Sequence, residues 1–537
     1  MAMSAPASAP LTDIDALVVG AGFAGLYMLH RLRGMGLSAR VIEAGGGVGG
    51  TWYWNRYPGA RCDVESVEYS YGFSEQLQQQ WQWSERYAAQ PEILRYLEHV
   101  AERFALYPDI QFNTRVLAAH FDADTARWRV TTDSGSYHAR YCVMATGCLS
   151  STNLPDLPGL AHYQGRVLHT GRWPHQAVSF AGQRVGLIGT GSSGIQVTPE
   201  IAKQAQHLYV FQRTANWSVP ARNTVIEAAQ VAAVKSDYQG YRARQRKLGA
   251  ACHLPPNKQS ALAVESEERE RIYEQWWTRG GLSFLGAFGD LIFDQRANDT
   301  AADFIRAKIS ATVRDPLVAA KLIPEHALGC KRACSDSQYY ETFNRDNVTL
   351  VDLRVSPLQT FTTNGIRTAN ADYDLDAVVF ATGFDAMTGA LERIDIRGTD
   401  GLTLKDKWAA GPRTYLGLAT AGFPNFFIIT GPGSPSVLAS MTVGIEHHVE
   451  WIAECIDWLG RQGATRIEAA REAEDAWVEH VNTVAARTLM QGCNSWYVGA
   501  NIPGKPRVFL PYVGGFPRYE AKCSEVAAKG YEGFKLA

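Results

Sequence analysis

The chain has 537 residues, of which 46% are hydrophobic and 20% charged, and its formal net charge is -2. It carries no basic arm or stripe, which argues against nucleic-acid binding, and no apolar run reaches the roughly 18 residues that a membrane-spanning helix needs. The length predicts about three or four domain-sized units.

The N-terminal segment, Met1 to Pro10, has no cationic stretch followed by an apolar one, so we expect a disordered tail rather than a signal peptide. The nine cysteines are scattered and include no Cys-x-x-Cys pair. We therefore expect free thiols and no disulfide framework, as in a cytoplasmic protein, and we expect that protein to be a monomer. No metal site is expected, because the neighbouring His447 and His448 would point in different directions on a helix.

The first glycine-rich motif follows a predicted strand, Asp15 to Gly20, and begins a helical pattern. Its glycines are Gly20, Gly22 and Gly25. They allow a tight turn and close approach of the backbone to a pyrophosphate at the helix N-terminus. A second predicted strand ends at Glu43, which is placed to accept hydrogen bonds from a ribose. This βαβ unit predicts a site for a dinucleotide with a free ribose, such as FAD.

A glycine cluster, Gly45 to Gly50, comes next and is followed by the aromatic run Thr51 to Trp54. Glycine lets the backbone approach a flat ligand, and the aromatic rings could pack against it. A plain loop followed by core aromatics is the alternative. Asp63, in the irregular segment that follows, would by default be a solvated or turn carboxylate.

The second glycine-rich motif, Gly189 to Gly194, follows a predicted strand at Gln183 to Ile188. The next predicted strand, Leu208 to Gln212, is followed by Arg213, where the first unit has Glu43. A carboxylate there would repel a ribose 2′-phosphate, whereas an arginine can pair with it. The second unit is therefore predicted to bind NADPH.

Each unit is followed later by a strand that runs into Ala-Thr-Gly, at residues 145–147 and again at 381–383. This repetition indicates a duplicated dinucleotide-binding architecture. We predict an α/β fold with two Rossmann-like dinucleotide-binding domains and a helical insertion. The expected division is 1–149 and 384–537 for the FAD domain, 150–224 and 329–383 for the NADP domain, and 225–328 for the insertion.

The C-terminal region offers two further segments for a cofactor site. A buried strand, Asn425 to Thr430, leads into the loop Gly431 to Pro435 and then a predicted helix, Leu438 to Leu459. The loop Ser495 to Lys505 contains one large aromatic residue, Trp496. Such loops often close over cofactors, although a static surface loop fits the composition equally well.

Two dinucleotides in one chain indicate hydride transfer from NADPH to a flavin, with the protein positioning both. A disulfide reductase would need a redox cysteine pair, so oxygen is the leading acceptor for the reduced flavin. The residues alone leave an oxygen-using flavoenzyme and a non-catalytic flavin-binding protein as interpretations.

The segment Tyr163 to Pro174 resembles the Phe-x-Gly-x-x-x-His-Thr-x-x-Trp-Pro fingerprint of type I Baeyer–Villiger monooxygenases. Its fingerprint residues are Gly165, His169 and Trp173, and Tyr163 in place of Phe is a departure. The resemblance covers nearly the whole chain and is closest to the phenylacetone monooxygenase group, with the cyclohexanone monooxygenase group also similar. N-hydroxylating flavin monooxygenases have a similar fingerprint but lack the Trp-Pro ending. The resemblance therefore favours oxygenation of ketones, and oxidation of nitrogen or sulfur atoms is the alternative.

The resemblance implies a reaction in which NADPH reduces FAD and O2 adds to form a flavin C4a-peroxide anion. This anion attacks a cyclic or aryl-alkyl ketone, and the tetrahedral adduct rearranges to a lactone or ester. Arg332 would be the active-site cation and Asp63 its carboxylate partner. Arg213 and Lys331 would contact the 2′-phosphate, and Trp496 the bound nicotinamide nucleotide. For His169 we expect a structural role.

The resemblance also implies a larger set of cofactor and substrate residues. The expected cofactor-binding residues are Gly20, Gly22, Phe23, Gly25, Glu43, Thr51, Trp52, Asp63, Tyr69, Val116, Met441, Thr190, Gly191, Ser192, Ser193, Gly194, Gln196, Arg213, Thr214, Lys331, Arg332 and Trp496. The expected substrate pocket contains Ser436, Val437 and Leu438. The family usually has Gly-Thr-Lys-Arg where this chain has Gly-Cys-Lys-Arg, and the region 225–328 diverges most, so the resemblance identifies no single ketone.

Overall fold

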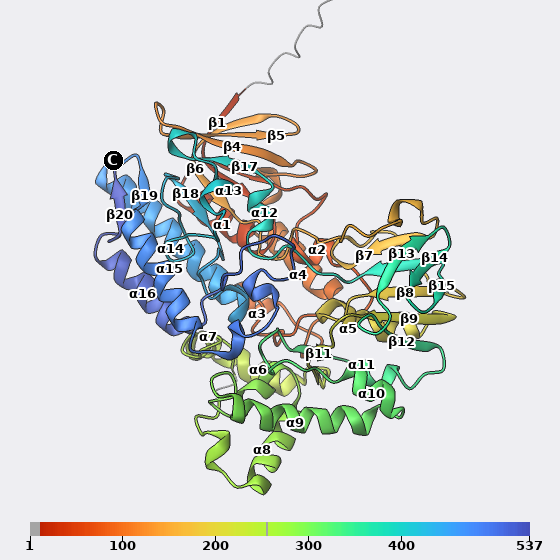
Figure 1. Cartoon of the computed structure of the whole chain (residues 1–537). Helices are drawn as coiled ribbons and strands as arrows, with labels where there is room; N and C mark the ends of the chain where they lie inside the picture. Colours follow the sequence, from red (N-terminus) through yellow and green to blue (C-terminus); the bar gives the residue numbers. More distant parts are fainter. Residues whose placement is uncertain (1–10, 254–255) are drawn as a thin grey trace, which may run out of the picture.

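The computed structural model describes residues 11–253 and 256–537, and the N-terminal segment Met1 to Pro10 discussed above lies outside them. Two separate sheets dominate the fold, each with helices packed against it (Figure 1). No helix in the described ranges is long and apolar enough to cross a membrane.

The first sheet combines N-terminal and C-terminal strands. Its order is β17-β4-β5-β6-β1-β2-β3, with β18 also paired to β6. The strands are β1 (Leu11–Val19), β2 (Ala39–Ile42), β3 (Ile110–Gln111), β4 (Val116–Asp122), β5 (Arg127–Thr132), β6 (Ser136–Met144), β17 (Asp395–Arg397) and β18 (Phe426–Ile428). Because β17 and β18 pair with β4 and β6, the chain after residue 384 returns to this sheet.

Helices cover the first sheet. They are α1 (Phe23–Gly34), α2 (Thr51–Trp54), α3 (Glu75–Gln80), α4 (Gln90–Arg103), α12 (Gly389–Glu392), α13 (Leu404–Lys407), α14 (Met441–Gln462), α15 (Arg471–Ala485) and α16 (Phe516–Ala528). Most of α1 is buried, because it packs between the sheet and α14. A two-stranded sheet of β19 (Ile467–Ala469) and β20 (Phe534–Leu536) joins the C-terminal helices.

The second sheet is all-parallel, in the order β12-β9-β8-β16-β7. Its strands are β7 (Arg166–His169), β8 (Arg184–Ile188), β9 (His207–Gln212), β12 (Val348–Asp352) and β16 (Ala377–Phe380), and α5 (Ser192–Ala202) follows β8. A meander of β13 (Leu358–Thr362), β14 (Gly365–Thr368) and β15 (Asp372–Asp374) precedes β16.

In the sequence, the predicted helical insertion lies between strands β9 and β12 of the second sheet. Its helices are α6 (Ala228–Ser236), α7 (Tyr238–Arg246), α8 (Ser266–Arg279), α9 (Gln295–Thr312) and α10 (Pro316–Leu322). They form the lower part of the molecule in Figure 1. The chain returns to the second sheet through β11 (Cys334–Asp336), which pairs with β10 (Ser218–Pro220), and α11 (Tyr339–Thr342).

The two glycine turns have the same geometry, which confirms the predicted pair of Rossmann-like units. A Cβ added at Gly25 would overlap the carbonyl oxygen of Gly20, and one added at Gly194 would overlap that of Gly189. Gly20 and Gly189 in turn lie against Ala145 and Ala381, the first residues of the two Ala-Thr-Gly segments. The repeated sequence motifs are therefore neighbours in space within each unit.

Candidate functional site

The first nucleotide cradle lies at the start of α1. No side chain caps this helix, so its first backbone N–H groups remain available to an anion. Glu43 is buried at the end of β2, and its carboxylate accepts hydrogen bonds from the amides of Ala21 and Gly45, both at 2.7 Å. Burial raises the pKa of Glu43, and the two amides offset part of that effect. The cradle fits a pyrophosphate and a ribose.

An aromatic wall adjoins this cradle. The rings of Phe23 and Tyr69 meet edge to face at 5.2 Å, and the Trp52 indole donates to the Tyr69 hydroxyl at 3.2 Å. A Cβ on Gly22 would contact Gly50, so these two backbone segments approach closely. The surroundings fit a flat ring system such as a flavin.

The remaining predicted cofactor residues of this region lie in different clusters. Thr51 is exposed at the first position of α2, and Val116 is buried with Ile42 on the other side of the sheet. Met441, at the start of α14, packs against the cluster that contains Val437. The structure therefore does not bring all of these residues into one contact set.

The second cradle, at the start of α5, is also free of a side-chain cap. The Thr190 hydroxyl donates to the Thr214 carbonyl at 2.8 Å, which ties the glycine turn to the segment after β9. Gln196, on α5, accepts from the Tyr57 hydroxyl at 2.8 Å and donates to the Arg61 carbonyl at 3.1 Å. Ser192 lies 3.4 Å from the Cys334 sulfur, and Ser193 follows it in the first turn of the helix. This helix thus connects the second unit to the segment after the aromatic run.

Two cations lie beside the second cradle. Burial lowers the pKa of Lys331, and the positive charge of Arg213 lowers it further. Within the described ranges neither side chain forms an ion pair. Because two unpaired cations repel each other, a dianionic group would stabilise both, and the residues present fit a 2′-phosphate.

Arg332 and Asp63 form an ion pair between the two units. The Arg332 Nε and one terminal nitrogen donate to Asp63 Oδ2 at 3.0 and 2.8 Å, and the other terminal nitrogen donates to the Val437 carbonyl at 2.9 Å. Their side chains are 26% and 21% exposed, so Asp63 is not the solvated carboxylate that its loop context predicted. A guanidinium has five N–H groups, and it retains at least one donor for a substrate oxygen.

The Arg332 guanidinium stays protonated. Burial alone would lower the pKa of Arg332, but the Asp63 carboxylate and the Tyr497 hydroxyl more than offset it, and the pKa is raised. The ring of the buried Tyr497 packs at a tilt against that of Trp496, with centroids 4.4 Å apart and an angle of 53° between the planes. The sequence pattern did not identify Tyr497 or the Val437 carbonyl, and adjacency to Trp496 was the one available signal. The site can hold a fixed cation against a developing oxyanion.

The predicted substrate residues form one wall of this site. Ser436, Val437 and Leu438 make a 3₁₀ turn, and the Ser436 hydroxyl lies 3.7 Å from the Met387 sulfur. The predicted helix from Leu438 instead begins at Met441. The amide of Ser440 donates to the Ala250 carbonyl at 2.8 Å, outside any helical pattern, so the chain breaks between the turn and α14.

A disulfide joins Cys330 to Cys493, with Cα atoms 6.1 Å apart. The expectation that all cysteines are free thiols was wrong for this pair, and the other seven are free. The two residues are 163 positions apart, and only the folded arrangement of two loops brings them together. The bond connects the residue before Lys331 to the loop that carries Trp496.

The far end of the Trp496 loop is held by polar contacts. The Asn501 amide donates to the Phe384 carbonyl at 2.7 Å. Lys505 forms a nearly buried ion pair with Asp385 and donates to the Ala386 carbonyl at 2.9 Å. The loop is therefore attached at both ends to segments that border the site.

The fingerprint segment connects structural elements of the two units. His169 accepts from the Gly171 amide through Nδ1 at 3.0 Å, and its Nε2 lies 3.3 Å from the Asn153 carbonyl. Burial lowers the pKa of His169, which keeps the ring neutral. Trp173 is buried, and its amide donates to the Trp54 carbonyl at 3.3 Å. A Cβ on Gly165 would overlap the ring of Tyr163. The segment thus joins the second sheet to the aromatic run of the first unit.

Comparison with known proteins identifies the family. Residues 17–236 match the family described as pyridine nucleotide-disulphide oxidoreductase. A Baeyer–Villiger monooxygenase from Pseudooceanicola batsensis is 44% identical over 97% of this chain and 95% of its own. A phenazine N-monooxygenase from Lysobacter antibioticus is also 44% identical, over 98% and 97%.

Among solved structures, an oxidised steroid monooxygenase bound to NADP is 54% identical with a TM-score of 0.94, covering 98% of this chain and 99% of that one. These matches cover nearly the whole chain, including the segments that carry both nucleotide cradles, the fingerprint and the Asp63–Arg332 pair. The chain belongs to the Baeyer–Villiger monooxygenase family.

Proposed function

We propose that this enzyme uses NADPH and O2, with FAD as its resident cofactor, to convert ketones into esters or lactones. The observation that carries the proposal is the Asp63–Arg332 pair, placed between two nucleotide cradles and bordered by an apolar wall. FAD, when bound, supplies hydride acceptance and oxygen activation. The protein supplies binding, orientation and charge.

Arg332 contributes a permanent positive charge that stabilises negative charge developing on the substrate oxygen. Asp63 orients this guanidinium through Oδ2, and the Val437 carbonyl holds its other terminal nitrogen. Both contacts fix the donor direction before substrate arrives, so little reorganisation is required during the reaction.

Arg213 and Lys331 are the residues that we expect to select NADPH, through the 2′-phosphate. Their mutual repulsion in the absence of an anion supports this assignment. We expect Trp496 to contact the nicotinamide nucleotide. The disulfide that joins the segment before its loop to Cys330, the residue before Lys331, supports this expectation. These contacts would also exclude water from the site.

The substrate class is a cyclic or aryl-alkyl ketone. The wall formed by Ser436, Val437 and Leu438 is largely apolar, which suits a hydrocarbon framework around a single carbonyl. Relatives named cyclohexanone 1,2-monooxygenase and acetone monooxygenase, at 41% and 40% identity, support ketones in general.

Oxidation of nitrogen or sulfur atoms is the second candidate. It is favoured by the phenazine N-monooxygenase at 44% identity, which matches this chain as closely as the Baeyer–Villiger relative does. Both reactions use the same cofactors, so cofactor binding does not separate them.

A substrate panel separates the two candidates. Purified holoenzyme with NADPH is incubated with cyclic ketones, aryl-alkyl ketones, amines and sulfides under 18-oxygen gas, and products are analysed by mass spectrometry. We expect one labelled oxygen in esters or lactones. If ketones gain no oxygen while amines or sulfides do, the first proposal fails and the second replaces it.

The domain division predicted from the sequence belongs to the same proposal, as do a monomeric state and a cytoplasmic location. The return of β17 and β18 to the first sheet supports the boundary near residue 384. Light scattering of the purified protein tests the monomer. Thiol counting on protein isolated from the cytoplasm tests whether Cys330 and Cys493 are paired there.

A further inference from the structure

The disulfide between Cys330 and Cys493 borders the proposed nicotinamide nucleotide site. Cys330 directly precedes Lys331, and Cys493 lies two residues before the loop Ser495 to Lys505, which carries Trp496. The bond therefore joins the two segments from which we expect contacts to this nucleotide. What else holds each segment decides what the bond does.

The Cys330 side of the bond belongs to a segment that is fixed before and after it. The buried Asn298, on α9, donates to the Leu328 carbonyl at 2.8 Å and accepts from the Leu328 amide at 2.9 Å. The Cys334 amide, at the start of β11, donates to the Trp217 carbonyl at 2.8 Å. We therefore expect this segment to keep its place when the disulfide is broken.

The Cys493 side has few other attachments. Among the residues that the structure describes, every hydrogen bond of residues 490–496 except one stays within residues 488–500. The exception joins two exposed side chains, with Arg507 donating to the Asn494 side-chain oxygen at 2.5 Å. An exposed contact of this kind contributes little, so the disulfide is the main restraint on these residues.

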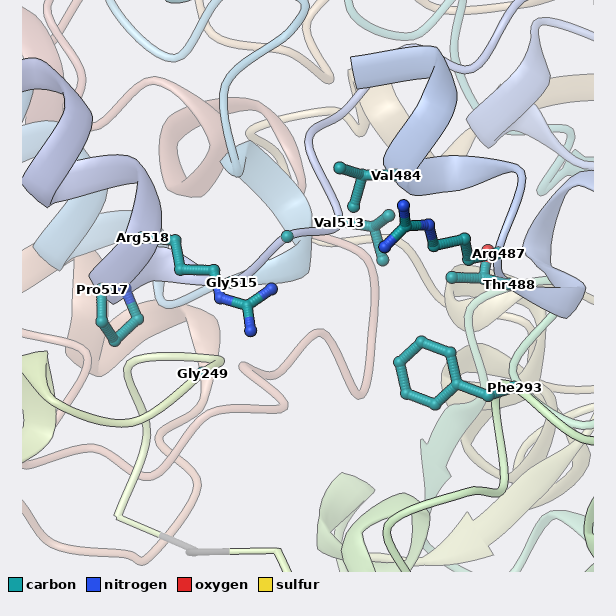
Figure 2. A pocket seen from close by; sticks show the side chains of 10 residues that line it. Gly249, Phe293, Val484, Arg487, Thr488, Val513, Gly515, Pro517 and Arg518 are labelled. Atoms are coloured by element: carbon teal, nitrogen blue, oxygen red, sulfur yellow. The ribbon is translucent and has the colours of Figure 1, made fainter. Parts of the chain in front are cut away.

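The connection from α15 to this segment also has open space on one side. Figure 2 shows Arg487, at the end of α15, on one side of a surface pocket and Phe293 on the other. The cavity volume of this pocket is about 490 Å³. The Leu489 amide donates to the Ile292 carbonyl at 2.9 Å, and this is the last backbone contact with another element before Cys493. The segment thus has room to move when the disulfide no longer holds it.

The far end of the loop has anchors that do not involve the disulfide. Asn501 and Lys505 hold it to residues 384–386. Breaking the bond should therefore loosen Trp496 and Tyr497 without detaching the whole loop. A restraint that acts on one end of a loop is suited to control, because the loop can return to the same place.

We propose that the Cys330–Cys493 disulfide is a redox switch for the nicotinamide nucleotide site: the oxidised protein holds Trp496 near Lys331, and reduction loosens Trp496 and weakens the binding of NADP(H). The proposal rests on the proposed function, which assigns these two residues to the nucleotide. A loop that is already held in place loses less conformational entropy when the nucleotide binds, so the oxidised form should bind it more tightly.

The reductant is a dithiol, and it reacts at Cys493. This residue is partly exposed between the exposed Gly492 and Asn494, whereas Cys330 is buried. A thiolate of the dithiol attacks the Cys493 sulfur, the S–S bond breaks, and Cys330 leaves as a thiolate that takes up a proton. The second thiolate of the reductant then attacks the mixed disulfide, which releases the Cys493 thiolate to take up a proton and leaves the reductant oxidised. The reverse exchange with the oxidised dithiol restores the bond.

The binding test titrates NADP+ into the holoenzyme with FAD bound and follows the heat by calorimetry. We expect dithiothreitol to raise the Kd for NADP+ about 10-fold, and oxidised dithiothreitol to restore it. Cys493→Ser, which leaves Lys331 and its neighbours unchanged, should have the higher Kd from the start and show no response to the reductant. Cys252→Ser removes a free thiol and is the matched control, so it should respond as the parent does.

Hydrogen exchange of backbone amides needs neither nucleotide nor turnover. The amides of residues 490–498 should exchange faster after reduction, and those of residues 326–334 should not. Equal exchange at 490–498 in both forms, an equal Kd for NADP+ in both forms, or a remaining response in Cys493→Ser overturns the switch. Loss of FAD on reduction also overturns it, because the effect would then not be local. If both expected effects appear but neither form oxygenates a ketone, the proposed function fails and the switch stands.

Discussion

Arg213 and Lys331 are two positive charges that approach each other without a carboxylate between them. Such an arrangement is unfavourable until an anion arrives, so the preference for NADPH over NADH should reside in this pair. In the first unit the corresponding position is the buried carboxylate Glu43, which would repel a phosphate. One position, occupied by opposite charges, thus distinguishes two otherwise similar cradles.

We expect Arg213→Ala to raise the KM for NADPH about 10- to 100-fold, the range for one charge-assisted contact, and to leave the KM for NADH nearly unchanged. Steady-state oxidation of both nucleotides measures this. Arg345→Ala, another exposed cation of the second unit, is the control. Equal loss for both nucleotides would contradict the assignment.

Variants of Arg332 and Asp63 distinguish the effect of the positive charge from the effect of its orientation. Arg332→Ala should leave flavin reduction by NADPH largely intact but reduce ester formation at least about 100-fold, because it removes the cation opposite the developing oxyanion. Asp63→Asn keeps that cation but weakens its alignment, so a smaller loss is expected. Anaerobic stopped-flow absorbance follows flavin reduction, and gas chromatography follows the ester. A normal ester yield from Arg332→Ala would show that Arg332 is not needed for the reaction.

Helix α14 carries a buried acid that titrates near neutrality. Glu446 is buried and accepts hydrogen bonds from the amides of Gly72 and Phe73, in the segment before α3, at 2.6 and 3.0 Å. Burial raises its pKa to about 7, although Arg242 and the amides oppose the shift. The protonated carboxyl is therefore the form that the folded helix favours.

This raised pKa makes stability depend on pH. The unfolded chain releases the Glu446 proton near pH 4.5 and the folded chain near pH 7, so the stabilisation present below pH 4.5 is lost as pH rises to 7. The loss amounts to about 3 kcal/mol. Glu446→Gln should lack this part of the decline, as measured by unfolding temperature from pH 5 to 8. Glu525→Gln is the control, because its lowered pKa acts below that window. Parallel curves for Glu446→Gln and the parent would contradict the prediction.

Elements with a local pattern were predictable, and contacts supplied by distant loops were not. The βαβ units follow from apolar strands, glycine spacing and helical periodicity within short windows, and the structure reproduces them. The break between Leu438 and Met441 was missed, because it depends on a hydrogen bond from Ser440 to Ala250 far away in the sequence. Helix boundaries of this kind require knowledge of tertiary partners.

In the candidate site too, residues without a local sequence pattern could not be predicted from the residues alone. Arg332 and Asp63 were predicted as site residues only from the family resemblance, because neither residue has a local signal for catalysis. Tyr497 and the Val437 carbonyl were missed, since a backbone oxygen carries no sequence pattern and a single tyrosine has no local signal for a role in the site. The pairing of Cys330 with Cys493 also has no local signal.

At the scale of the whole molecule, contacts in several separate regions connect the two units, and three of these contacts have been described above. The fingerprint contributes the contact between Trp173 and Trp54, and α5 contributes Gln196 with Tyr57. The ion pair of Arg332 with Asp63 is the third. Any change in the relative placement of the units would alter all three, so cofactor exchange and reaction geometry should respond together.

The disulfide adds a covalent restraint at this scale. By the loop-entropy relation, closing a ring of 163 residues destabilises the unfolded chain by about 5 kcal/mol.

We expect dithiothreitol to lower the urea midpoint of the parent protein. Cys330→Ser should already unfold at the lower midpoint and show no further response to the reductant. Cys252→Ser, which removes a free thiol, should behave as the parent does. A parent midpoint insensitive to reductant, with both thiols shown to be free by mass spectrometry, would contradict the pairing.

The position of the two cysteines also orders events during synthesis. At ordinary elongation rates Cys330 leaves the ribosome roughly 10 to 30 s before Cys493, and both nucleotide cradles have emerged by then. The bond cannot close until the last helices of the chain have nearly been made. Oxidation of this pair is therefore a late step of maturation. A newly made molecule that contains the disulfide is one in which the loop Ser495 to Lys505 has already docked beside Arg332.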